Sequence, residues 1–261
     1  MDTIKVKLTE LYESRNIIKA LVVKNLIGNY RNSFLGFAWN FVMPLVLLCM
    51  YYVIFSQIRT TYIADFWIYL AAGIFPFNYM VNNVTSGSVC LVNNAQMIKK
   101  MYFPREAIVL SHVITTFIIM LIGYAVILVA IAITGYGFGV SAILLPVLFF
   151  LSFFFTLGYV LILSSITVYL RDVHHFLSSV SVIFFFVTPL YFTLDSISGL
   201  FSIIVRLNPF TYFVESYQQI IFYKAIPDMS LLLTTCLITC ISFISGIIVF
   251  EKIKKGFAER L

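Results

Sequence analysis

Residue types that carry out catalysis or bind metals are few in this chain and do not cluster. The 261 residues include three histidines, of which His174 and His175 are adjacent. Adjacent residues of a helix point about 100° apart, which is a poor geometry for sharing a metal. The four cysteines lie in or beside apolar stretches without a CxxC pair, and the carboxylates are scattered. We therefore expect no catalytic residue and no metal site.

Motifs for nucleotide binding and hydrolysis are also missing from the sequence. It contains no GxxxxGKS or GxxxxGKT loop, no GxSxG and no HExxH. In other proteins these motifs bind phosphates, supply a serine nucleophile and bind zinc. Nothing in the sequence thus argues for bond-breaking chemistry, or for a cofactor held by this chain.

Polar side chains recur within one otherwise apolar stretch. Asn78, Asn82 and Thr85 stand at positions i, i+4 and i+7, which is one face of a helix. Inside a bilayer such a face turns toward a water-filled path or toward a partner helix. A path and simple interhelical hydrogen bonding are both open readings of this face.

Aromatic residues form 17% of the chain. Flat apolar rings with polar tips suit sugar surfaces, which present both C–H and hydroxyl groups. Packing or an interfacial aromatic belt is the alternative for most of these rings. The candidates to line a path are Trp39, Tyr51, Tyr52, Phe55, Phe149, Phe150, Phe153 and Tyr191.

The composition indicates the environment that positions these side chains. Hydrophobic residues make up 61% of the chain and charged residues 11%, against about 25% charged residues in a soluble domain. A soluble protein of this composition would have no polar surface. We expect an all-α integral membrane protein, with residues 1–261 as one domain and no cleaved signal peptide.

Long uncharged runs indicate six transmembrane helices. Runs of 27, 33, 64, 22 and 22 residues carry no formal charge, and a membrane helix needs about 20 apolar residues. The longest run holds two helices if it turns at GYGFGVS, residues 135–141. The predicted spans are 34–57, 66–86, 108–133, 142–168, 175–194 and 229–250.

The basic residues predict the orientation of these spans. With six spans, 14 of the 17 lysines and arginines fall on one side, in the N-terminal segment, the 87–107 loop, Arg171 and the C-terminal tail. Cytoplasmic loops carry such an excess, so both termini are expected in the cytoplasm. The net charge of +6 follows from this rule and requires no nucleic-acid partner.

Two segments look helical but too short to span. Residues 8–30 are expected to form an amphipathic helix on the cytoplasmic interface, an ordinary solvated lead-in being the alternative. Residues 195–228 are expected to form two short re-entrant helices on the outer side. Asn208 and Pro209 suit the N-cap and first position of the second helix. Glu215 within it is either functional or faces outer water.

The basic segment 93–107 is expected to form a short cytoplasmic helix over 95–102, which Pro104 ends. One face of this helix is apolar and the other is polar. The apolar face consists of Met97, Ile98, Met101 and Tyr102, and the polar face of Gln96, Lys99 and Lys100.

Seven segments, in order, resemble the polysaccharide exporter permeases of the type-2 ABC transporter family. They span nearly the whole chain, and the ordered set is far more specific than any one of them. The segments are NYRNSFLGFAWNFVMPL (29–45), GIFPFNYM (73–80), NAQMIKKMYFPREAIVLS (94–111), YLRDVHHF (169–176), TPLYF (188–192), LNPFTYFVES (207–216) and FAERL (257–261).

The resemblance implies a homodimeric permease of the bacterial inner membrane, paired with two copies of a separate ATPase subunit that binds ATP and Mg²⁺. It implies export of a polysaccharide on undecaprenyl diphosphate, with O antigen expected and capsule or teichoic acid as alternatives. The 95–102 helix would couple the two subunits by seating its apolar face in the ATPase. A simple headgroup anchor is the alternative.

The resemblance further implies that Arg105, Arg171 and Asp172 add contacts to the ATPase. A path between two subunits must be sealed when idle, so the short outer helices with Asn208, Pro209 and Glu215 are expected to act as its gate. Two other functions are weaker. A membrane glycosyl- or acyltransferase would need clustered carboxylates or histidines, and an anchoring protein would need neither the asparagine face nor re-entrant helices.

Overall fold

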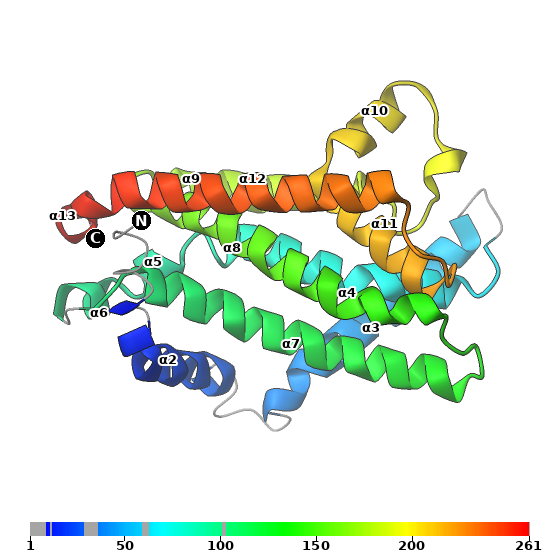
Figure 1. Ribbon diagram of the computed structural model, residues 1–261, viewed down its shortest axis with the longest axis horizontal. Coiled ribbons are helices and arrows are strands. Elements are labelled where there is room, and N and C mark those ends of the chain that lie inside the picture. Colours follow the sequence, from blue (N-terminus) through cyan, green and yellow to red (C-terminus); the bar gives the residue numbers. More distant parts are fainter. Residues whose placement is uncertain (1–8, 11, 29–35, 59–62, 101–102, 261) are drawn as a thin grey trace.

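Backbone polar groups inside a bilayer must be hydrogen-bonded within the protein, and helices achieve this locally. The computed structural model describes residues 9–10, 12–28, 36–58, 63–100 and 103–260. Within these residues all regular elements are helices and no strand occurs, which agrees with the predicted all-α class (Figure 1). The α-helices are α2 (Arg15–Gly28), α3 (Trp39–Ile58), α4 (Phe66–Thr85), α5 (Cys90–Asn93), α6 (Ala95–Lys100), α7 (Glu106–Ile133), α8 (Leu145–Tyr169), α9 (Asp172–Phe186), α10 (Gly199–Leu207), α11 (Pro209–Ile221), α12 (Met229–Ile253) and α13 (Phe257–Arg260). Short 3₁₀ turns cover Gly36–Ala38, Val140–Leu144, Leu194–Ser196 and Lys254–Gly256.

Three of the predicted spans are confirmed as helices long and apolar enough to cross a membrane. They are Glu106–Ile133, Val140–Tyr169 and Met229–Gly256. Each contains one of the predicted ranges 108–133, 142–168 and 229–250 in full. The turn between the first two, with positive φ at Gly135 and Gly137, is where the glycines were expected to permit it.

The predicted first and second spans coincide with α3 and α4, and their crossing of the membrane stays a prediction. α4 packs against α3, α7, α8, α9 and α11, so most of its residues are buried inside the protein. A helix enclosed by other helices does not need an apolar surface all round. This enclosure explains how α4 accommodates Asn78, Asn82 and Asn83, which lower its hydropathy.

The predicted fifth span, 175–194, is wrong at its end. α9 stops at Phe186, and residues 187–193 form turns in which the Leu190 amide donates to the Thr188 carbonyl. Pro189 explains the early end, because proline and the residue before it disfavour continuing a helix. The 15 residues of α9 extend about 22 Å at 1.5 Å per residue, less than the roughly 30 Å hydrocarbon layer.

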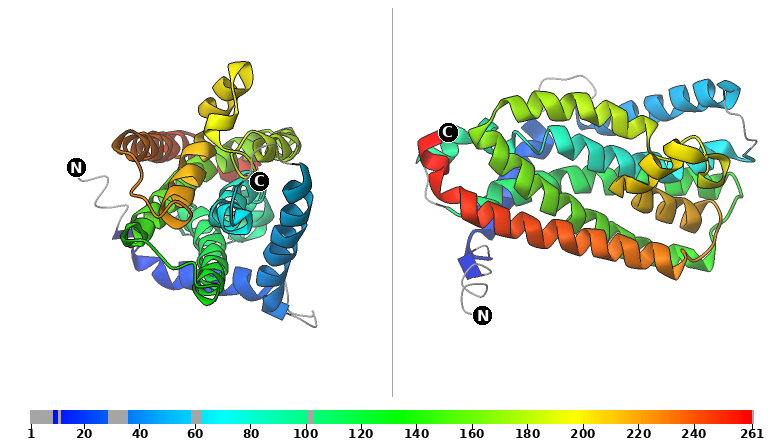
Figure 2. Two further views of the ribbon diagram at one scale, coloured as in Figure 1. Left: turned by 90° about the vertical axis from the view of Figure 1, so that its right-hand side faces the viewer. Right: turned by 90° about the horizontal axis from the view of Figure 1, so that it is seen from above.

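The short helices exist, but they occupy different environments. α2 buries Leu21 and Val22 and packs against α7. Of the two outer helices, α11 lies within the bundle, whereas α10 projects from its side (Figure 2). α10 exposes apolar residues such as Leu200 and Leu207, at 74% and 77%. Re-entry of both helices into the membrane therefore stays a prediction.

Pro76 interrupts the hydrogen bonding in the middle of α4. A proline has no amide hydrogen, so the carbonyl of Ala72, four residues earlier, loses its usual partner. The buried hydroxyl of Tyr124 on α7 donates to this carbonyl at 3.3 Å. The neighbouring helix thus satisfies a polar group that would otherwise be left unpaired in the core.

The closest helix pair is α8 with α12, which cross at two glycines. A Cβ on Gly246 would lie 2.8 Å from the Cα of Gly158, so neither position has room for a side chain. The Ser242 hydroxyl donates to the Phe155 carbonyl at 2.9 Å in the same contact. Small residues allow such close approach, which drives helix association in membranes.

Replacing Gly246 with valine should lower the thermal unfolding temperature, because α8 and α12 would have to separate. Overpacking of this kind costs about 1–3 kcal/mol or more. Thermal unfolding of the purified protein, followed by size-exclusion chromatography, measures it. The control Ser245→Val adds a similar branched side chain at the neighbouring position, which is half-buried. Equal stability of the two variants would contradict a tight crossing.

Candidate transport pathway and coupling sites

The predicted coupling helix is observed as α6, Ala95–Lys100. Gln96, Lys99 and Lys100 are exposed, and Met97 is half-buried. Ile98 is 8% exposed and lines a cavity of about 580 Å³ inside this chain. The apolar face is therefore turned into the chain at Ile98, and the polar face is left exposed. Met101 and Tyr102, which were assigned to the apolar face, lie outside the described residues.

The loop after α6 is tied to the end of α12 by charged side chains. The Lys254 ammonium donates to Glu106 at 2.6 Å and to Glu251 at 2.9 Å. The Arg105 guanidinium donates to the Lys254 carbonyl and lies 5.9 Å from the centre of the Phe257 ring. Arg105, a predicted coupling residue, thus connects two segments of this chain.

The second predicted contact, Arg171 and Asp172, lies where α8 passes into α9. Both side chains are exposed. The start of α9 lies at the same end of the bundle as α6 (Figure 1). Nearby, the Tyr169 hydroxyl donates to the Ile253 carbonyl at 3.1 Å, which ties this junction to α12. Those predicted coupling residues that the structure describes therefore lie at one end, around the end of α12.

The predicted asparagine face lines a groove between α4 and α7. Asn78 and Asn82 border this cavity of about 190 Å³, with Thr116 of α7 opposite. The side-chain amides of Asn78 and Asn82 form no hydrogen bond within the described part of the chain. Thr85 differs, because its hydroxyl donates to the Asn82 carbonyl. This leaves two amides at the groove with unused hydrogen-bonding groups.

Asn83, which the sequence interpretation did not single out, carries the interhelical hydrogen bonds instead. It is fully buried and its amide donates to Thr116 Oγ1 at 3.0 Å and to the Tyr79 carbonyl at 2.8 Å. Whether the face of Asn78, Asn82 and Thr85 borders a path therefore stays a prediction. Asn83 joins α4 to α7, and Asn78 and Asn82 face the groove.

Three of the predicted aromatic residues meet between α3 and the end of α9. The rings of Phe55 and Tyr191 stack with centres 4.2 Å apart and planes at 9°. Tyr51 contacts Phe185 at 4.8 Å, and Phe185 also contacts Phe55 at 6.1 Å. Phe185 was missed, since a phenylalanine in an apolar helix carries no special signal. All four rings are half-buried.

The other predicted aromatic residues lie elsewhere. Trp39 begins α3, about 18 Å along the helix from Tyr51 at 1.5 Å per residue. Tyr52 is exposed and stacks on Phe66. Phe149 contacts Tyr124 and Tyr217 inside the bundle, so it serves packing. Phe150 and Phe153 both pack near Phe154 on α8.

Asn208 and Pro209 begin α11 as predicted. The Asn208 side chain accepts a hydrogen bond from the Phe210 amide at 3.1 Å, which is the expected N-cap. Its amide nitrogen also donates to Thr188 Oγ1 at 2.8 Å. Asn208 is 5% exposed, so the cap also fastens α11 to the turn after α9.

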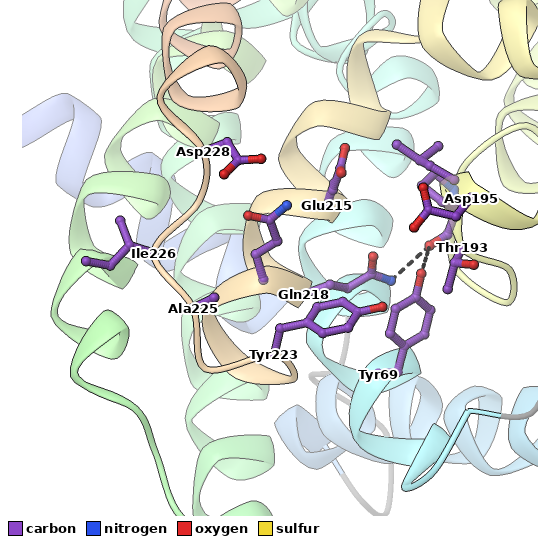
Figure 3. Close-up of a pocket in the computed structure, with 12 residues that line it drawn as sticks. Tyr69, Thr193, Asp195, Glu215, Gln218, Tyr223, Ala225, Ile226 and Asp228 are labelled. Atoms are coloured by element: carbon purple, nitrogen blue, oxygen red, sulfur yellow. Dashed lines mark hydrogen bonds between the residues drawn. The ribbon is translucent and has the colours of Figure 1, made fainter.

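Glu215 borders a cavity of about 380 Å³ between α11, α4 and the connecting loops (Figure 3). Asp195 and Asp228 line the same cavity, so Glu215 faces a polar space and not lipid. Burial raises the pKa of the Glu215 carboxyl, and the nearby charges of Asp195 and Asp228 raise it further. The positive charge of Arg206 lowers it, but the net pKa is raised from its ordinary value of 4.5. No group of three metal-ligating side chains occurs in the part of the chain that the structure describes.

Long apolar helices beside a groove with polar side chains are features of a membrane transport protein. The profile of the ABC-2 type transporter family matches residues 16–222, most of the chain, which therefore belongs to this family. Its members are membrane subunits of transporters and not enzymes.

Curated relatives carry a more specific name. The chain is similar to the O-antigen export system permease protein RfbA of Myxococcus xanthus, at 28% identity over 258 residues, 97% of this chain and 98% of that protein. Two proteins of that name from Klebsiella pneumoniae are 29% and 28% identical over 175 residues, which cover 67% of this chain and 68% of each.

Replacing Glu215 with glutamine should stabilise the protein at neutral pH. A carboxyl whose pKa is raised on folding binds its proton more tightly when folded, so stability falls as pH rises through and above its ordinary value of 4.5. Thermal unfolding of wild type and Glu215→Gln between pH 4 and 8 should therefore diverge as pH rises.

The matched control for this experiment is Glu13→Gln, which removes an exposed carboxylate of the first helical segment. It tests for a general effect of losing one negative charge. Parallel stability profiles of wild type and Glu215→Gln across the pH range would show that Glu215 is as well solvated as an ordinary carboxylate.

Proposed function

We propose that this chain is the membrane subunit of an exporter that moves a lipid-linked polysaccharide, O antigen, from the cytoplasm to the periplasm. The observation that carries the proposal is the nearly full-length similarity to an O-antigen export permease. The ring cluster of Tyr51, Phe55, Phe185 and Tyr191 supports it, because such rings suit sugar surfaces. Undecaprenyl diphosphate is the proposed lipid carrier, and the inner membrane the proposed location.

The proposed orientation places α6 and both termini in the cytoplasm. It rests on the excess of lysines and arginines, 14 of 17, in the segments assigned to that side. The clustering of α6, α13 and the start of α9 at one end of the bundle supports it, because four of these 14 basic residues lie in or directly before these elements (Figure 1). The opposite end, with α10 and α11, is then periplasmic.

Energy is proposed to come from two copies of a separate ATPase that bind ATP and Mg²⁺. The exposed Gln96, Lys99 and Lys100 of α6 form the proposed docking surface, with Arg171 and Asp172 as a second contact. Ile98 anchors α6 to the chain, and the Glu106–Lys254 bridge ties the following loop to α12. A push on α6 would thus reach α7 and α12 together.

The proposed path lies between two copies of the chain. α9 has no buried residue within one copy, and it exposes His175 and Ser179 as well as apolar side chains. α12 by contrast exposes a largely apolar face that includes Leu233 and Ile241, as lipid requires. A membrane helix that exposes polar groups needs protein or water beside it. We place α3, α9 and the asparagine groove toward that boundary.

The segment of Asn208, Pro209 and Glu215 is proposed as the outer gate. Because Asn208 joins α11 to the turn after α9, movement of α9 would be transmitted to α11. The cavity beside Glu215 offers space for such a movement. Sealing the path at its outer end would prevent ion leakage when no polysaccharide is being exported.

Reversing the charge of the proposed docking surface should separate the two subunits. Lys99→Glu with Lys100→Glu should abolish co-purification of the ATPase encoded with this permease, while the variant still inserts. Lys252→Glu with Lys255→Glu makes the same charge change on exposed residues of the α12 end and should retain the ATPase. Retention of the ATPase by the α6 variant at wild-type yield would exclude this surface.

Cysteine reactivity should show whether the asparagine groove contains water. In a background without the four native cysteines, Asn78→Cys and Asn82→Cys should react with a membrane-impermeant maleimide in permeabilised vesicles. Ile244→Cys, which is exposed in one copy but proposed to face lipid, should not react. If both groove cysteines stay unreactive with and without ATP, the groove is closed to water and serves helix packing.

A further inference from the structure

The outer cavity beside Glu215 has walls from four parts of the chain. α11 contributes Glu215 and Gln218, α4 contributes Tyr69, and the connections on either side contribute Asp195 and Tyr223 (Figure 3). Asp195, Tyr223 and other residues of the rim are exposed, whereas Tyr69 and Gln218 are buried at 2% exposure each. The cavity is thus a cup with a rigid floor that opens outward. Its volume of about 380 Å³ lies within the range of small-molecule sites.

The hydrogen-bond donors of the floor are already used within the protein. The Tyr69 hydroxyl donates to the carbonyls of Phe192 and Pro189, at 2.8 and 3.3 Å. The Gln218 amide nitrogen donates to the Pro189 carbonyl at 2.9 Å. This bond uses the amide nitrogen of Gln218 and leaves its amide oxygen free of that contact.

The acceptors, in contrast, remain available. The amide oxygen of Gln218 and the carboxylates of Asp195 and Asp228 accept no hydrogen bond within the described part of the chain. The Gln218 residue is 2% exposed, and its amide oxygen gains a hydrogen bond only when a ligand or water in the cavity supplies a donor. The cavity therefore suits a molecule that brings several N–H or O–H groups.

The negative charges that line the cavity indicate which class of ligand it can bind. Asp195, Glu215 and Asp228 give the cavity a negative field, which the Arg206 charge opposes at Glu215. An anion would be repelled from this cavity. No three ligating side chains meet closely enough, among the residues described, to hold a metal ion. A neutral or cationic organic molecule rich in hydroxyl or amino groups remains.

The two tyrosine rings supply apolar surface beside these polar groups. Tyr69 and Tyr223 lie edge to face, with ring centres 6.4 Å apart and planes at 86°. Tyr223 is 53% exposed at the rim, so one side of its ring is open to a ligand. Rings next to carboxylate and amide acceptors suit a sugar, which combines C–H faces with hydroxyl donors.

We propose that this cavity binds single sugar units of the exported polysaccharide, that it accepts neutral and amino sugars, and that it rejects acidic ones. The proposal rests on the proposed function and adds an outer sugar site with a charge preference. Its position beside α11 places sugar binding next to the proposed gate. A sugar held there on its way out would contact both α11 and the 223–228 connection.

Saturation-transfer NMR on the purified full-length chain in nanodiscs tests the proposal with three probes. They are the methyl glycosides of glucose, glucosamine and glucuronic acid at millimolar concentration. Transfer to the glucoside or the glucosaminide should exceed transfer to the glucuronide about fivefold, given partly screened repulsion by the carboxylates. Equal transfer to all three glycosides, or no transfer to any, would overturn the proposal.

Two variants locate the binding. Tyr223→Ala should reduce transfer to the neutral glycoside about fivefold or more, as expected for losing a ring contact of roughly 1 kcal/mol. Asp195→Asn with Asp228→Asn should bring the glucuronide signal up toward that of the glucoside. Asp65→Asn, which changes an exposed aspartate that does not line the cavity, should leave all signals unchanged.

These measurements are independent of the ATPase, so the two proposals fail separately. If the chain co-purifies with its ATPase and supports export but shows no glycoside transfer, only the sugar site is wrong. Binding with the stated preference, in a chain that never pairs with an ATPase, would retain the site and reject the exporter. Loss of the glycoside signal on adding calcium chloride would identify the cavity as a cation site and overturn the proposal.

Discussion

The close approach of α8 and α12 at Gly158 and Gly246 is the contact on which both functional ends depend. Because no side chain separates the two backbones there, α12 is held along α8 over much of its length. This alignment brings the end of α12 to the start of α7, where Lys254 meets Glu106. It also fixes the wall against which α11 packs at the other end. A wider crossing would displace both regions at once.

Between those ends, α4 acts as the central element. Five other helices cover it, so its polar residues need not avoid lipid. The Asn83 side chain donates a hydrogen bond to α7, whereas the side-chain amides of Asn78 and Asn82 line the groove without a hydrogen bond among the described residues. In its first turn the same helix places Tyr69 in the floor of the cavity beside Glu215. One enclosed helix therefore carries candidate polar contacts from the middle of the bundle to its outer rim.

Local features were predictable from the sequence, and distant pairings were not. Asn208 and Pro209 marked the start of α11 because capping depends on adjacent residues. Long uncharged runs predicted α7, α8 and α12, because the composition of a membrane helix is also a local property of the sequence. Pro189 would have corrected the end of α9 if proline had been weighed against hydropathy. Periodicity placed Met97 and Ile98 on one face of α6, but it could not say that this face meets the chain's own body. No pattern links Glu106 with Lys254, which are 148 residues apart.

Pro76 has a consequence for how α4 can deform. The missing amide makes this point the natural place for the helix to flex. The carbonyl that it frees, however, is held by the Tyr124 hydroxyl of α7. If α4 bends at this point, either α7 moves with it or the hydrogen bond between Tyr124 and the Ala72 carbonyl breaks in apolar surroundings. The hydrogen bond therefore couples the two helices at Pro76, so that α4 cannot bend there without moving α7 or breaking this bond.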